Sequence, residues 1–146
     1  MKRPAHYFLV LILLAGTLIG AFAQNEAVEI TLKSPYNTML VHLQYLQSKT
    51  YAPERSAQAL PQGLDSLQAV RLAIQLKQIY DGEGLLVHLS RVPTDSNYVD
   101  SLSNRNIYTP FPDELPDIYL EKTGNQWRYA DAAIQAIPGI HQQVYP

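Results

Sequence analysis

The chain has 146 residues, no cysteine, and a formal net charge of −2 from 11 basic and 13 acidic side chains. This length fits one domain. The lack of cysteine excludes disulfides, thiol catalysis, thiolate metal sites and a lipid-modified N-terminal cysteine. The basic residues form no cluster outside the N-terminus, which argues against nucleic acid or an anionic membrane surface as a partner.

Residues 1–23 have the pattern of a cleavable secretory signal. Lys2 and Arg3 precede an apolar run, and Ala21 and Ala23 place small residues where signal peptidase needs them. An uncleaved anchor is the alternative, but a spanning helix needs roughly 20 apolar residues and only 17 uncharged residues precede the cleavage site. We therefore expect an exported, periplasmic protein with no membrane span after signal removal.

Residues 24–33 are predicted as a lead-in, either an edge strand or a linker, before a single domain at 34–146. Ser34 and Pro35 supply a helix N-cap and first residue, and the helix is expected to run to about Ser48. Its apolar stripe is Tyr36, Met39, Leu40, Leu43 and Leu46, of which Met39, Leu43 and Leu46 are expected in the core. His42 is expected on the solvent side.

Two further helices are predicted before residue 84. Ala52-Pro53-Glu54 opens a short helix that ends near Leu60. Asp65 caps a longer helix that Asp81-Gly82 ends. The wide apolar face of this helix comprises Leu67, Val70, Leu72, Ala73, Ile74, Leu76 and Ile79.

After residue 84 the spacing of apolar residues changes from the 3.6-residue period of a helix to the two-residue period of a strand. Leu85, Val87 and Leu89 occupy alternate positions, with His88 between the last two. This alternation predicts a half-buried strand with His88 on its solvent-exposed face. A long polar loop follows at 93–106. A second short strand is predicted at 107–111.

The clearest local pattern is a hairpin at 118–130, which turns at Thr123-Gly124-Asn125. Asp131 is expected to cap a final helix that ends before Pro138-Gly139. The predicted fold class is therefore α+β. It has three N-terminal helices packed on a small antiparallel sheet, with a C-terminal hairpin and a short final helix.

The sequence predicts no catalytic, cofactor-binding or metal-binding residue, and no cofactor. His42, His88 and His141 lack the spacing of a helical zinc site. The acidic residues Asp113, Glu114 and Asp117 are interpreted as a solvated turn, and Asp81-Gly82-Glu83-Gly84 as a helix stop rather than a calcium loop. An exported hydrolase that uses Asp113, Glu114 or His88 is the least favoured hypothesis.

Aromatic residues are unusually frequent in the C-terminal half. They include Tyr98, Tyr108, Tyr119, Tyr129 and Trp127. Two interpretations stay open: cross-strand pairs that close a small core, with Tyr119 facing Trp127 or Tyr129, or an interaction surface.

The chain resembles the extracytoplasmic N-terminal segment of some bacterial, Bacteroidetes-type members of the small-conductance mechanosensitive ion channel family. The resemblance covers most of the predicted mature chain in order. The matching stretches are Ser34-Pro35-Tyr36, His42-Leu43, Tyr51-Ala52-Pro53-Glu54 to Ala57 and Leu60, residues 73–79 with Asp81-Gly82, Pro93 to Tyr98 with Asp100-Ser101, residues 116–122, Trp127-Arg128-Tyr129 and Val144-Tyr145-Pro146.

The resemblance implies a non-enzymatic sensory or interaction module outside the membrane. Its expected partners are channel subunits, other envelope proteins or copies of itself. The pore helices of the family have no counterpart in this sequence, so this polypeptide alone is not expected to form a pore. The alternative is a stand-alone periplasmic domain that binds a small ligand, similar at fold level only to domains like nuclear transport factor two.

Overall fold

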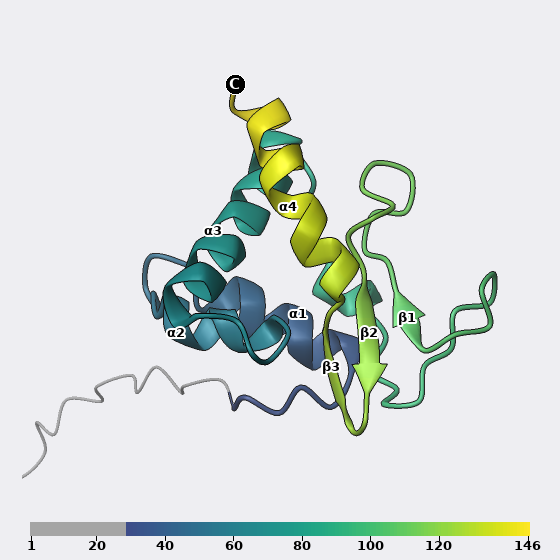
Figure 1. Ribbon diagram of the computed structural model, residues 1–146. Helices are drawn as coiled ribbons and strands as arrows, with labels where there is room; N and C mark the ends of the chain where they lie inside the picture. Colours follow the sequence, from purple (N-terminus) through teal and green to yellow (C-terminus); the bar gives the residue numbers. More distant parts are fainter. Residues whose placement is uncertain (1–28) are drawn as a thin grey trace, which may run out of the picture.

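The structure is a computed structural model that describes residues 29–146, so the predicted signal lies outside the described residues. The helices are α1 (Pro35–Gln44), α2 (Pro53–Ser56), α3 (Ser66–Gly82) and α4 (Asp131–Val144), with 3-10 turns η1 (Ala57–Ala59) and η2 (Leu89–Arg91). The strands are β1 (Ile107–Tyr108), β2 (Leu120–Thr123) and β3 (Gln126–Tyr129). The predicted α+β class is confirmed (Figure 1).

Helix α1 begins as the sequence predicts but buries a different face. The Ser34 hydroxyl accepts the Asn37 N–H at 3.2 Å, and Pro35 is the first helical residue. Leu43 and Leu46 are only half-buried, whereas His42 is fully buried, so its expected place on the solvent side is wrong. The helix ends at Gln44, before the expected Ser48.

Residues 29–33 explain why a second face of α1 is buried. Leu32 is 2% exposed and packs with Val41 and Tyr45 in a small cluster separate from the main core. The Leu32 carbonyl also accepts the backbone N–H of Trp127 at 2.8 Å. The described end of the lead-in is thus neither a regular strand nor a free linker, because it docks on α1 and β3.

Helices α2 and α3 lie where the second and third helices are predicted. Helix α2 continues into η1 and stops before Pro61, and the Asp65 carboxylate caps α3 by accepting the N–H groups of Leu67 and Gln68 at 3.1 and 3.2 Å. Leu67 itself is 74% exposed, because it lies in the first turn of α3, outside the packed face. The buried residues of α3 are Leu72, Ala73, Leu76, Ile79 and Tyr80.

The strand expected at residues 85–89 does not form. Leu85 and Val87 are half-buried against the core, so their alternation marks one-sided burial rather than pairing with another strand. The chain enters η2 at Leu89 instead. His88 is exposed, as expected.

The three strands form one antiparallel sheet in the order β1-β2-β3. Gly124 has a φ of +62° at the first central position of the hairpin turn, which suits a type II′ turn. This turn pairs Thr123 with Gln126 and Leu120 with Tyr129. Tyr119 precedes β2, so the expected pairing of Tyr119 with Trp127 or Tyr129 is wrong.

Helix α4 is longer than predicted. It runs through Pro138 and ends at Val144, and Ala130 rather than Asp131 is its N-cap residue. It packs along α3 (Figure 1). Gly82 permits this approach, because a Cβ there would lie 2.8 Å from the Tyr145 phenol oxygen. No helix within residues 29–146 is long and apolar enough to cross a bilayer.

Candidate binding groove

The β2–β3 hairpin has one buried face and one open face. Trp127 and Tyr129 point into the core with 0% and 1% exposure. The alternating residues Gln126 and Arg128 lie on the opposite face, because successive side chains of a strand point to opposite sides. The register places Thr123 beside Gln126 and Glu121 beside Arg128 on that same face.

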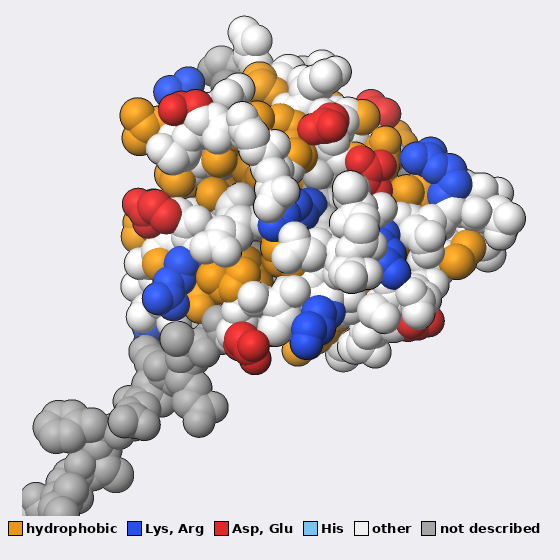
Figure 2. Space-filling view, turned by 60° about the horizontal axis from the view of Figure 1, so that its bottom comes forward, with side chains coloured by type: hydrophobic (Ala, Val, Ile, Leu, Met, Phe, Trp, Pro, Cys, Tyr) orange, Lys and Arg blue, Asp and Glu red, His pale blue; other side chains and the backbone are white. Residues whose placement is uncertain are grey.

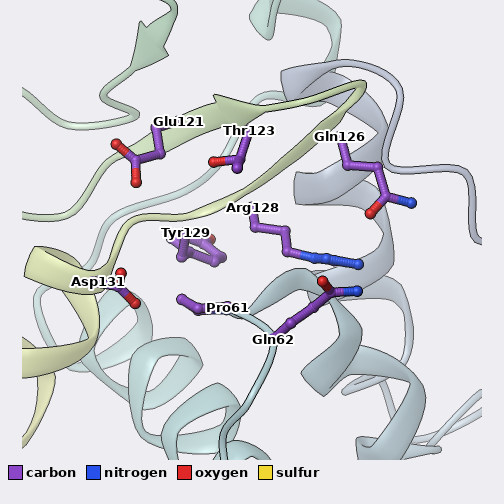
Figure 3. A pocket seen from close by; sticks show the side chains of 8 residues that line it. All are labelled: Pro61, Gln62, Glu121, Thr123, Gln126, Arg128, Tyr129 and Asp131. Carbon is purple, nitrogen blue, oxygen red and sulfur yellow. The ribbon is translucent and has the colours of Figure 1, made fainter.

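Two cavities meet at Arg128. The polar cavity, of about 260 Å³, is lined by Pro61, Gln62, Glu121, Thr123, Gln126, Arg128, Tyr129 and Asp131 (Figure 3). The apolar cavity, of about 340 Å³, is lined by Glu54, Ala57, Gln58, Leu60, Pro61, Gln62, Gly63, Leu64, Ser66, Ala69, Val70 and Arg128. Because they share Pro61, Gln62 and Arg128, we treat them as one feature, the Arg128 groove.

Arg128 forms no ion pair within the described residues, although Glu54, Glu121 and Asp131 line the same two cavities. Its Nε is buried and has no hydrogen-bond partner within the described residues. Glu121 lies directly across the strands from Arg128. Desolvation by burial lowers the pKa of Arg128, but a guanidinium stays charged at neutral pH. A partly desolvated cation that forms no ion pair can bind an anionic ligand.

The charges in the polar cavity are spatially separated. The Arg128 side chain extends toward Gln62, whereas Glu121 and Asp131 lie on the other side of Tyr129 (Figure 3). Glu121 instead faces Arg105, with a nitrogen–oxygen distance of 4.0 Å. The cavity therefore has a basic end next to the apolar cavity and an acidic end at the start of α4.

A buried polar network fixes Tyr129, which lines the polar cavity. His42 Nε2 lies 2.9 Å from the Ala73 carbonyl oxygen and Nδ1 lies 3.0 Å from the Tyr129 hydroxyl. A carbonyl can only accept, so Nε2 carries the proton and Nδ1 accepts from Tyr129. The Tyr80 hydroxyl, 3.2 Å away, then donates to the Tyr129 oxygen. Burial lowers the His42 pKa from 6.5 to about 4, so this imidazole is neutral at neutral pH.

The five aromatic residues of the predicted interaction surface are not all at the surface. Trp127 and Tyr129 are core residues, and Tyr119 is half-buried. Tyr98 packs against Tyr108 and Trp127, with ring centroids 6.0 and 6.5 Å apart. The Trp127 indole donates to the Ser96 carbonyl at 3.0 Å and thereby fixes the loop at 93–106. Most of this set therefore closes the core and anchors a loop.

The residues weighed for hydrolysis lie outside the groove. Asp113 and His88 are exposed, and Glu114 and Asp117 line a third cavity, of about 280 Å³, together with Glu83. Within residues 29–146, no group of three or more histidine or acidic side chains is placed to hold a metal ion.

One face of the molecule carries charged side chains of both signs. Figure 2 shows Lys, Arg, Asp and Glu side chains interspersed with exposed hydrophobic ones on one face. A mixed surface of this kind gives no long-range attraction for a polyanion.

Comparisons with known proteins add no assignment. No family model, curated protein or solved structure matches this chain.

Sequence reasoning located the hairpin but did not single out Arg128 or Gln62. A two-residue turn at Gly124 places Glu121 opposite Arg128, so the sequence contains the signal for a cross-strand pair. The sequence does not indicate that Glu121 and Arg128 form no ion pair within the described residues, because the position of the Arg128 side chain depends on how the loop at 60–64 packs beside β3.

Proposed function

We propose that this chain is a non-enzymatic, extracytoplasmic interaction module that binds its partner in the Arg128 groove. The observation that carries the proposal is the Arg128 guanidinium, which forms no ion pair within the described residues and lies at the junction of a polar and an apolar cavity. A buried polar group without a partner calls for an explanation, and a bound ligand is one such explanation.

The resemblance to the extracytoplasmic segment of mechanosensitive channels supports the same class of function. In this proposal the module is exported by its signal, and it contacts channel subunits, other envelope proteins or copies of itself. The module lies outside the membrane and does not form a pore alone.

In-cell photo-crosslinking tests this proposal. A benzophenone amino acid replaces Gln58, an exposed residue on the rim of the apolar cavity. The matched control carries the same group at Gln142, an exposed residue near the far end of α4. We expect a larger adduct in the envelope fraction from position 58, and Arg128→Met should reduce its yield at least fivefold.

Three results would count against the interaction module. They are no adduct from either position, adducts of equal yield from both, or an adduct at position 58 that is unaffected by Arg128→Met.

A stand-alone ligand-binding domain is the second candidate, and the size of the groove favours it. Each cavity is near the roughly 300 Å³ lower end of small-molecule sites. A ligand that binds only the folded state raises the melting temperature. A rise of several degrees with a small periplasmic metabolite, absent in Arg128→Met, would favour this candidate over the interaction module.

A further inference from the structure

We infer that the Arg128 groove binds the free carboxyl terminus of a peptide whose last side chain is apolar. This inference rests on the proposed function, since it names the kind of partner that the interaction module would take.

The carboxylate requirement comes from Arg128. A guanidinium binds a carboxylate through two parallel N–H···O bonds. Because Nε is buried, the terminal Nη groups are the ones that a ligand can reach. Gln62 and Gln126 line the same cavity, and their amides can donate to and accept from the peptide backbone beside the carboxylate.

The apolar requirement comes from the adjoining cavity. Arg128 lines both cavities, so a group bound to its guanidinium lies at the mouth of the apolar one. The side chains that make that cavity apolar are Ala57, Leu60, Leu64, Ala69 and Val70. The last side chain of a peptide is attached to the Cα atom, which is bonded directly to the carboxylate carbon. This side chain can therefore enter the apolar cavity while the carboxylate stays on Arg128.

The acidic end of the polar cavity restricts the ligand further. Glu121 and Asp131 lie beyond Tyr129, opposite the direction of Arg128 (Figure 3). Their negative charges disfavour a doubly charged anion such as a phosphate group, because like charges repel. They favour a basic side chain upstream of the carboxyl terminus.

Fluorescence anisotropy with a labelled peptide ending in Lys-Ala-Leu tests the inference on the mature chain. We expect saturable binding of the free acid, at least tenfold weaker binding of the C-terminal amide, and at least threefold weaker binding when Glu replaces the Lys. Arg128→Met should weaken binding of the free acid at least tenfold. Arg71→Met, the same change at an exposed position of α3, should leave the affinity within twofold.

Equal binding of acid and amide, or equal binding by Arg128→Met, would overturn the inference. So would binding of octanoate, but not of the peptide, in an Arg128-dependent manner. Absence of peptide binding together with an Arg128-dependent crosslink at position 58 would overturn the carboxyl-terminus inference and leave the interaction module standing. Absence of both would overturn both.

Discussion

The imidazole of His42 is fully buried, and both of its ring nitrogens are hydrogen-bonded. Desolvation is the largest cause of its low pKa, and the charge of Lys77 lowers it further, while the bond to the Ala73 carbonyl opposes them. Protonation of Nδ1 would also remove the acceptor that holds Tyr129. His42, a titratable residue of the core, therefore holds Tyr129, which lines the groove.

We expect stability to fall as the pH falls from about 6.5 to about 4, the two pKa values of His42 in the unfolded and folded chain. In this window the unfolded chain binds more protons, so the free energy of unfolding rises with pH. The loss between pH 7 and pH 5 should be about 2 kcal/mol, measured by urea denaturation. A His42→Gln variant should lose less than about 0.5 kcal/mol over the same range, and an equal loss in both proteins would contradict the assignment.

Single residues were the hardest features to predict from the sequence. Ser34, Asp65 and Gly124 act locally, and their predicted roles as two helix caps and a turn are confirmed. His42 and Arg128 instead depend on residues distant in sequence. The apolar stripe of α1 gave no sign that Ala73 and Tyr129 would satisfy a buried imidazole.

Helix α4 continues through Pro138 without a break. Proline has no N–H to donate to the carbonyl of Ile134, and it disfavours a helix interior. Ile134 and Ile137 are nevertheless buried as expected. Packing along α3 therefore outweighs the local preference that predicted an end at this position.

Replacing Pro138 by Ala should raise the free energy of unfolding by about 1–3 kcal/mol, because it restores one helical hydrogen bond. Gly139→Ala is the neighbouring control, since nothing lies within 4 Å of a Cβ there, and it should add about 0.5–1 kcal/mol. Both values come from chemical denaturation. A loss of stability in Pro138→Ala would mean that the proline is required for α4 to pack on α3.

The presence of the hairpin could be predicted because glycine at its turn is a local signal. Its register was not predicted, because the turn has two residues, Gly124 and Asn125, and therefore pairs Leu120 rather than Tyr119 with Tyr129. The segment at 85–89 could not be predicted, because alternation reports burial of one face and does not show whether another strand pairs with it. The groove shares this difficulty. It forms where the loop at 60–64 meets β3, and no local pattern relates these two segments.

At the scale of the whole molecule, the described end of the lead-in belongs to the folded unit. Leu32 has a left-handed backbone conformation, with a φ of +48°, which is unusual for a branched residue. Burial of its side chain and the bond from the Trp127 N–H hold it there. The start of the predicted domain at residue 34 therefore omits residues that the fold uses.

A chain that starts at residue 34 should be less stable than one that starts at residue 24. We expect a loss of about 2–4 kcal/mol, from the exposed surface under Leu32 and the unpaired Trp127 N–H. Urea denaturation of the two chains measures it. A difference below about 0.5 kcal/mol would show that the lead-in contributes nothing to the fold.

If Arg128 serves binding rather than the fold, replacing it should cost no stability, and the free energy of unfolding of Arg128→Met measures this. Methionine removes the buried Nε donor, which has no partner within the described residues, and keeps an apolar side chain of similar length. We expect a value equal to that of the unchanged protein or up to about 1 kcal/mol higher. A loss of more than about 1 kcal/mol would make Arg128 a structural residue and contradict its proposed role in binding.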